Sequence, residues 1–130
     1  MSHSKTKKLF LIFALSFVLN FCWENVHSVL YISYQGAPIT EFVLLRAALV
    51  DAIILTVLAV PFMQFPFWQR RKWLILPLGI FLAIVIELWA LRSGRWVYTT
   101  SMPLVPFLNV GLTPTIQFAI LGYGIYVLLL

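Results

Sequence analysis

Four acidic side chains and one internal histidine are the groups of this chain best suited to acid–base chemistry. Glu24, Asp51 and Glu87 each lie inside a long apolar segment, and Glu41 lies at the start of one. Because an ionisable group inside a membrane segment is energetically costly, each of these three is a functional candidate. His27 follows Glu24 by three residues, which places both on one face of a helix. Such a group of carboxyls and an imidazole could donate and accept protons.

The charge balance among these buried groups needs an explanation. Glu24, Asp51 and Glu87 against Arg46 leave an excess of two negative charges if His27 is neutral. Either some carboxyl groups are protonated, or His27 is charged, or a cation is bound. Arg46 and Asp51 lie about 140° apart around a helix, so we expect Arg46 to pair instead with Glu24 or Glu87 on another helix.

The composition predicts the elements that position these groups. The chain has 130 residues, of which 62% are hydrophobic and 10% are charged, whereas about a quarter are charged in soluble domains. We predict an all-α polytopic membrane protein, a four-transmembrane-helix bundle forming one domain over residues 1–130. The expected helices span residues 9–32, 42–63, 73–91 and 105–130.

The basic residues predict the orientation of this bundle. They gather before the first helix and between the second and third: Lys5, Lys7, Lys8, Arg70, Arg71 and Lys72. By the positive-inside rule both termini should be cytoplasmic. The buried acids then lie at similar depth in the outer half of the bilayer. The net charge of +5 does not indicate nucleic-acid binding, because these short basic clusters flank apolar segments and form no basic face.

Helical periodicity groups further polar residues with the acids. Ser16, Asn20, Glu24, His27 and Tyr31 fall within about 40° of a common direction on the first helix. Asn109, Thr113 and Gln117 form a looser stripe on the fourth.

The candidate site follows from these two stripes and from the residues near them. The predicted catalytic residues are Glu24, His27, Asp51 and Glu87. The predicted substrate-binding residues are Asn20, Trp23, Tyr31, Arg46, Arg92, Arg95, Trp96, Tyr98, Asn109 and Gln117. The arginines after the third helix, with Trp96 and Tyr98, either anchor the chain at the interface or hold a lipid phosphate.

The Glu24-x-x-His27 pair also occurs in di-metal helical bundles, but those sites use two such motifs and two further glutamates. We therefore predict no cofactor and no bound metal, and keep a metal at Glu24 and His27 as an alternative. A buried His27 that hydrogen-bonds Glu87 or Tyr31 is favoured over ligation.

Three short strings resemble a known group of membrane enzymes. They are residues 20–24 (NFCWE), residues 87–92 (ELWALR) and residues 94–98 (GRWVY) ahead of Met102 and Pro103. They are similar to patterns in the integral-membrane terpene cyclases of meroterpenoid pathways and, more remotely, in membrane carotenoid cyclases and hydratases. The resemblance implies that Glu24 acts as an acid, with Asp51 or Glu87 as its partner. Those enzymes are longer, so it also implies that a dimer supplies the missing helices.

The predicted function is an enzyme that acts on a lipophilic isoprenoid or lipid substrate by carboxylate acid–base chemistry in the outer half of the bilayer. The reaction would be of the cyclase, isomerase or hydratase-type lyase class. Two alternatives stay open: a small proton- or cation-coupled transporter, and a non-catalytic lipid-binding or assembly partner. The expected partners are membrane lipid and a hydrophobic small molecule, without nucleic acid, and with a homodimer or larger homo-oligomer left open.

Overall fold

Four long helices form the bundle in the computed structural model, which describes residues 2–130. They are α1 (His3–His27), α2 (Glu41–Gln64), α4 (Ile75–Arg92) and α5 (Leu112–Leu129). Each is long and apolar enough to cross a membrane. The predicted all-α, four-helix membrane fold is therefore confirmed.

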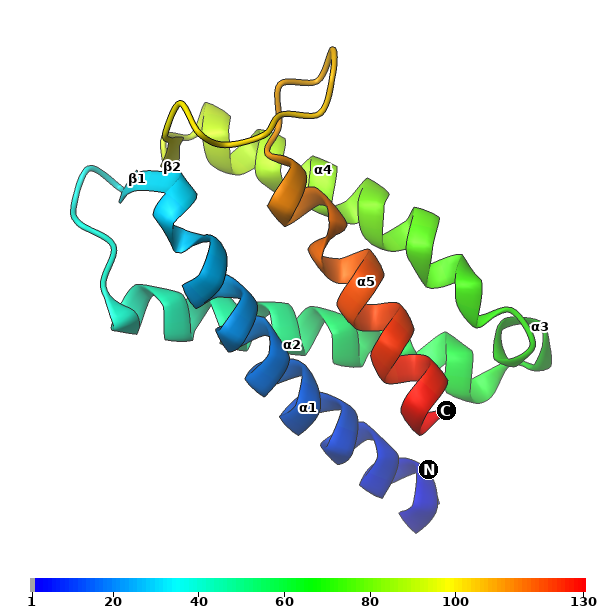
Figure 1. Ribbon diagram of the computed structural model, residues 1–130. Helices are drawn as coiled ribbons and strands as arrows, with labels where there is room; N and C mark the ends of the chain where they lie inside the picture. Colours follow the sequence, from blue (N-terminus) through cyan, green and yellow to red (C-terminus); the bar gives the residue numbers. More distant parts are fainter. Residues whose placement is uncertain (1) are drawn as a thin grey trace.

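The helices are arranged so that one pair stays apart. α1 packs along α2, α4 packs along α5, and α1 also packs against α5. α2 and α4 are on the flanks and make at most slight contact with each other. Both chain termini lie at one end of the bundle, which we call the terminal end (Figure 1). The helical turns α3 (Pro66–Gln69) and η2 (Lys72–Leu74) connect α2 to α4.

A small sheet joins two connections at the opposite end, which we call the sheet end. After the 3₁₀ turn η1 (Ser28–Leu30), β1 (Tyr31–Tyr34) pairs antiparallel with β2 (Trp96–Tyr98). Tyr31 is opposite Tyr98, and Tyr34 is opposite Trp96. The connection from α1 to α2 is thereby tied to the connection from α4 to α5.

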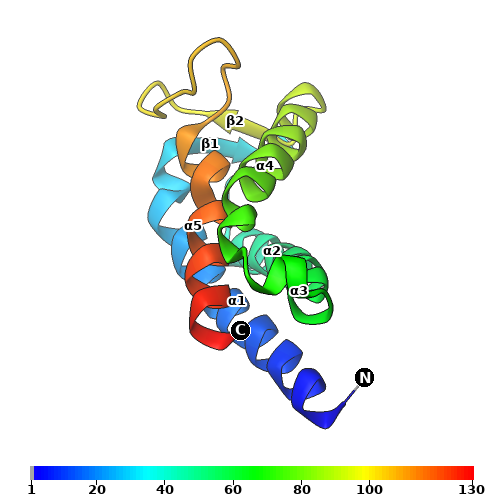
Figure 2. The same cartoon turned by 90° about the vertical axis from the view of Figure 1, so that its right-hand side faces the viewer.

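Three helix boundaries differ from the prediction. The first helix begins at His3 instead of residue 9, so that it includes the N-terminal lysines. It ends at His27 instead of residue 32, because the chain turns into β1. The last helix begins at Leu112 instead of residue 105. The preceding loop contains two prolines and two residues with positive φ, Phe107 and Asn109, and neither feature fits a helix. Figures 1 and 2 show this loop projecting beyond the bundle. The two middle helices lie within two residues of their predicted limits.

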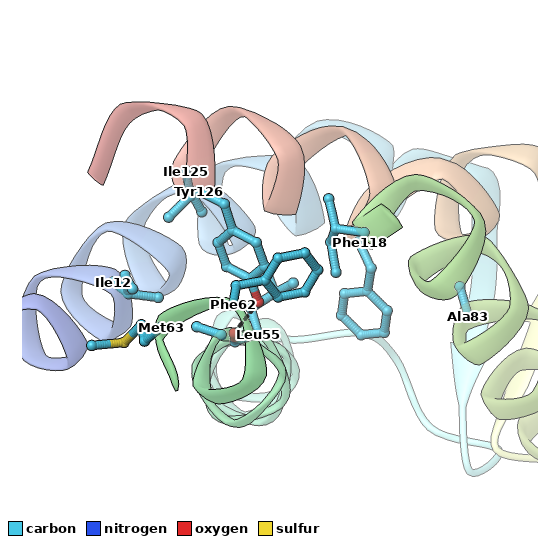
Figure 3. Packing of buried hydrophobic residues seen from close by; sticks show 10 residues of the cluster. Ile12, Leu55, Phe62, Met63, Ala83, Phe118, Ile125 and Tyr126 are labelled. Atoms are coloured by element: carbon cyan, nitrogen blue, oxygen red, sulfur yellow. Dashed lines mark hydrogen bonds between the residues drawn. The ribbon is translucent and has the colours of Figure 1, made fainter. Parts of the chain in front are cut away.

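An apolar core fills the terminal half of the bundle. Its buried side chains include Ile12, Leu55, Phe62, Ile125 and Tyr126 (Figure 3). The Tyr126 hydroxyl donates a hydrogen bond to the backbone carbonyl of Leu55, which satisfies the only polar atom of that side chain. The outward faces of the four helices are also apolar, with exposed Phe10, Val57, Phe81 and Val127 among them. Such faces suit contact with lipid.

Candidate functional site

A cavity of about 340 Å³ lies at the sheet end, bounded by all four long helices and the sheet. Its two flanking walls come from α2 and α4, the helices that do not pack on each other. Val50 of α2 and Trp89 of α4 line it and are more than half exposed, at 54% and 55%. The cavity therefore opens sideways between these helices, toward the surface that faces lipid.

Glu24 and His27 form one side of the polar interior. They belong to the buried face of α1, whose members are Ile12, Ser16, Asn20, Glu24 and His27. The predicted polar stripe on this helix is thus confirmed up to His27. His27 Nε2 lies 3.0 Å from Glu24 Oε2, and Nδ1 lies 2.9 Å from the Thr113 hydroxyl of α5.

His27 thus has different partners from those predicted, because Glu24 and Thr113 occupy its two ring nitrogens in place of Glu87 or Tyr31. An imidazole with a carboxylate on one nitrogen and a hydroxyl on the other can pass a proton between them.

Gln117 of α5 connects three helices through one amide nitrogen. Its Nε2 lies 2.8 Å from Asn20 Oδ1, 3.1 Å from Glu24 Oε1 and 3.0 Å from Asp51 Oδ2. An amide NH₂ has two hydrogens, so the three oxygens share two donors. Gln117 is buried, and the three acceptors lie on α1 and α2. It therefore holds the Glu24 and Asp51 carboxyl groups close together.

The carboxyl groups of Glu24 and Asp51 both approach the same Gln117 amide nitrogen. Two ionised carboxylates held this close in a low-dielectric interior repel each other, so we expect the pair to share one proton. The pair would then carry one negative charge instead of two. Both side chains line the cavity, but Glu24 is buried, at 7% exposed, whereas Asp51 is only partly buried. Asp51 is therefore the more accessible member of the pair.

Glu87 lies on the opposite flank and is held by two tyrosines. The Tyr98 hydroxyl donates to Glu87 Oε1 at 2.5 Å, and the Tyr31 hydroxyl lies 3.4 Å from the same atom. The Gly111 N–H in turn donates to the Tyr98 oxygen at 2.9 Å. Burial, and secondarily the charge of Glu87, raise the pKa of Tyr98 and of Tyr31, which therefore stay protonated. Glu87 is thereby fixed as an acceptor of phenol hydrogen bonds.

Aromatic side chains and two arginines complete the cavity near the sheet. The Trp96 ring packs between Tyr31 and Tyr34, with centroids 4.7 and 4.8 Å away. Arg95 and Arg46 also line the cavity. The prediction that Arg46 pairs with Glu24 or Glu87 is wrong. No lysine or arginine in residues 2–130 lies within 4.0 Å of a carboxylate. Its guanidinium instead lies over the ring of Phe42, 5.9 Å from the centroid.

Most of the predicted site residues meet at this cavity. Those that line it are Glu24, His27, Tyr31, Arg46, Asp51, Glu87, Arg95, Trp96 and Gln117. Asn20 and Tyr98 lie behind them and contact them by hydrogen bonds. Trp23 packs edge-on against His27, with centroids 6.3 Å apart.

Two of the predicted binding residues do not meet the cavity, and we leave them out of the candidate site. Arg92 at the end of α4 is exposed and lies outside the cavity. Asn109 is also exposed, because it lies in the loop instead of on the last helix.

Three contributors were missed by the sequence prediction. Trp89 lines the cavity from α4. Tyr34 lines the cavity and accepts a hydrogen bond from Arg95. Thr113 was recognised as part of the polar stripe but not as the partner of His27. The alternating aromatics of residues 31–34 (YISY) and 96–98 (WVY), followed and preceded by Gly36 and Gly94 with positive φ, were a usable signal for paired strands.

Within residues 2–130, no group of three or more His, Cys, Asp or Glu side chains is placed to hold a metal ion. Comparison of the chain with protein-family models, with curated proteins and with solved structures finds no match. The chemistry of the cavity therefore provides the basis for assigning a function.

Proposed function

We propose that this protein is a membrane-embedded enzyme that acts on a lipophilic substrate by carboxylate acid–base chemistry. The observation that supports it best is the close approach of the Glu24 and Asp51 carboxyl groups at a cavity that opens toward lipid. A lipid-soluble molecule could enter sideways between α2 and α4 without crossing an aqueous phase. The cavity volume falls at the small end of the range of about 300–1,000 Å³ for ligand sites.

Asp51 is the proton donor in this proposal, because both members of the pair line the cavity but Asp51 is the more exposed of the two. Its proton would pass to a double bond or a strained ring of the substrate, and the pair would be left as two carboxylates. Gln117 and His27 would stabilise that doubly charged state by hydrogen bonds to Glu24 and Asp51. His27 and Thr113 extend from Glu24 toward the loop at the sheet end and offer a route for replacing the proton.

Glu87 is the complementary base. It lies on α4, across the cavity from Asp51 on α2, so a substrate between these helices would meet the acid and the base on opposite sides. A proton added at one carbon and removed at another gives an isomerisation or, with ring closure, a cyclisation. Tyr31, Trp89 and Trp96 line the same cavity, and their aromatic rings would stabilise a transient positive charge.

The terminal half of the bundle favours an enzyme over a transporter. A transported proton or cation needs polar groups along a complete path. In that half the interior is filled by the apolar cluster of Ile12, Leu55, Phe62 and Ile125 (Figure 3). The polar groups are thus confined to a chamber with access from one side. A purely structural network, in turn, needs no open space between α2 and α4.

The test is product formation by the purified protein in proteoliposomes supplied with isoprenoid alkenes and epoxides, followed by mass spectrometry. We expect Glu24→Gln, Asp51→Asn and Glu87→Gln each to lower turnover by about 10²–10⁴-fold, the usual contribution of a general acid or base. Glu41→Gln is the matched control, because Glu41 is exposed and outside the cavity. Folding of each variant is checked by thermal unfolding. Unchanged turnover in folded Glu24→Gln and Asp51→Asn would refute the proposal.

A further inference from the structure

The cavity contains two cationic side chains whose charge no acidic residue neutralises. Arg46 of α2 and Arg95, just after α4, both line it. Within residues 2–130, neither lies within 4.0 Å of a carboxylate. An arginine near a membrane interior is stabilised by an anionic partner, and the protein itself does not supply one here.

Arg95 is held in a fixed orientation. Its guanidinium stacks over the Trp89 ring, 4.5 Å from the centroid, and Nη1 donates to the Tyr34 hydroxyl at 3.2 Å. Tyr34 itself packs on Trp96 of the neighbouring strand. A guanidinium stacked by its face keeps its edge available, and the edge carries the paired N–H groups that bind phosphate oxygens in a fork. The remaining donors of Arg95 are therefore preorganised for an oxyanion.

The arginines and the carboxyls occupy different levels of the cavity. α2 begins at the sheet end, and Arg46 precedes Asp51 by five residues, so it lies about 7 Å nearer that end. α4 finishes at the sheet end, and Glu87 lies five residues before its last residue, with Arg95 beyond. On both flanks the cation is thus closer to the sheet end than the acid. The cavity is basic at the sheet end and acidic below it.

We propose that Arg46 and Arg95 bind the phosphate headgroup of an amphiphilic substrate, whose apolar chain extends from there toward Asp51 and Glu87. This inference rests on the proposed function and adds the substrate class and its orientation. The reacting carbon atoms would lie along the chain, about 7 Å from the headgroup, which is the separation of Arg46 and Asp51 along their helix. A neutral hydrocarbon would use the carboxyls but leave both arginines without a partner.

Binding measurements test this without requiring turnover. Isothermal titration calorimetry of the protein in neutral detergent compares dodecyl phosphate with dodecanol, which differ only in the phosphate. We expect dodecyl phosphate to bind at least about tenfold more tightly, as charge-assisted bonds to two arginines should give. Arg46→Gln and Arg95→Gln should each remove most of this preference. Arg92→Gln should retain it, because Arg92 lies at the same end but outside the cavity.

Two further binding measurements are needed. One distinguishes bidentate binding by Arg95 from the effect of its charge alone, and the other distinguishes a phosphate headgroup from free inorganic phosphate. Arg95→Lys keeps the charge but loses the fork, so a reduced preference there indicates bidentate binding. Inorganic phosphate should bind far more weakly than dodecyl phosphate, because it lacks the chain that fills the apolar walls.

Three results would overturn the inference. These are equal binding of dodecanol and dodecyl phosphate, equal binding of inorganic and dodecyl phosphate, or loss of the preference in Arg92→Gln to the same extent as in Arg46→Gln. The last would show a general attraction of anions to the arginines at the sheet end. All three concern headgroup binding alone, so acid–base chemistry on a neutral substrate could still be found by the turnover test.

Discussion

Gln117 is the residue on which the arrangement of the acids most depends. One amide nitrogen lies within hydrogen-bond distance of an oxygen from Asn20, Glu24 and Asp51. Removing it leaves two buried acceptors with fewer donors in a low-dielectric interior, where unsatisfied polar groups are most destabilising. The close approach of Glu24 and Asp51 is therefore a property of three helices and not of α1 and α2 alone.

We expect Gln117→Met to lower the free energy of unfolding by about 1–3 kcal/mol, the usual effect of leaving a buried polar partner unsatisfied. Denaturant titration in detergent micelles measures it. Asn25→Met is the matched control, since the Asn25 amide donates only to the Phe21 carbonyl of its own helix. Its effect should stay within about 0.5 kcal/mol. Equal effects of the two substitutions would contradict the role assigned to Gln117.

Tyr98 predicts a pH dependence of stability. Burial and the neighbouring Glu87 raise its pKa in the folded protein above the unfolded value of about 10. Below about pH 10 the phenol is protonated in both states, and its stabilising contribution is complete. As the pH rises further, the unfolded chain ionises first, so stability is lost.

The measurement is the free energy of unfolding between pH 9 and 11.5 for the wild type and Tyr98→Phe. Above about pH 10, the wild type should lose up to about 1.4 kcal/mol per pH unit more than the variant. Parallel curves would show that Tyr98 ionises normally in the folded protein.

At the level of single residues, the sequence predicted most of the buried face of α1. It predicted few of the residues on other elements that contact the buried acids. Ser16, Asn20, Glu24 and His27 follow from the helical period, because that period fixes which side chains share a direction. The partners of Glu87 could not be predicted in the same way. Tyr31 and Tyr98 reach it from two strands whose pairing depends on residues more than sixty positions apart.

At the element scale, the contact between α4 and α5 depends on one close backbone approach. A Cβ atom added to Gly79 would lie 2.9 Å from the backbone nitrogen of Ala119, closer than such atoms pack. The two backbones would have to separate. Because α4 carries Glu87 and Trp89, a shift there would also move one wall of the cavity.

We expect Gly79→Ala to destabilise the protein by about 1–3 kcal/mol, as for overpacking in a tightly packed interior. Gly124→Ala is the control within α5, because nothing lies within 4 Å of its added Cβ. It should be neutral or stabilise by up to about 1 kcal/mol through helix propensity. Thermal unfolding in detergent compares the stabilities of the two variants. A Gly124→Ala variant less stable than Gly79→Ala would contradict the close approach of α4 and α5.

Helix positions were predictable from hydropathy because a membrane span needs a long apolar run. The residues at which the helices end were less predictable. The first helix ends at His27 although the apolar character continues through Leu30 to Ile32, since hydropathy alone does not distinguish a last helical turn from a strand. The last helix starts late because the backbone at Phe107 and Asn109 adopts positive φ.

At the scale of the whole molecule, both termini lie at the end of the bundle opposite the sheet (Figure 1). With four helices that are able to span a membrane, the termini and the sheet are expected on opposite sides of it. We expect the termini to be cytoplasmic, because the lysines in the first two turns of α1 and the basic residues between α2 and α4 lie at the terminal end. The cavity and its arginines then lie in the outer half of the bilayer.

Labelling of intact cells with an impermeant maleimide tests this orientation. In a Cys22→Ser background, a cysteine replacing Ser101 in the loop at the sheet end should be labelled from outside. A cysteine replacing Ser4 in the first turn of α1 should be labelled only after the membrane is opened. The reverse pattern would place the cavity in the inner half.

The number of spans could be predicted from the sequence, but the cavity could not. It exists because α2 and α4, which follow each other along the chain, stay apart while α1 and α5 pack between them. That order of packing depends on side-chain shape, such as Gly79 against Ala119, which hydropathy does not report.

In the proposed reaction, the Glu24–Asp51 pair transfers a solvent-derived proton to a lipophilic substrate. The most direct measurement is the incorporation of non-exchangeable deuterium into lipids, when proteoliposomes are incubated in D₂O with isoprenoid alkenes and a membrane lipid extract. We predict incorporation with the wild type and with Glu41→Gln, and a loss of about 10²-fold or more in Asp51→Asn and Glu24→Gln. Incorporation that persists unchanged in both folded pair variants would contradict the account.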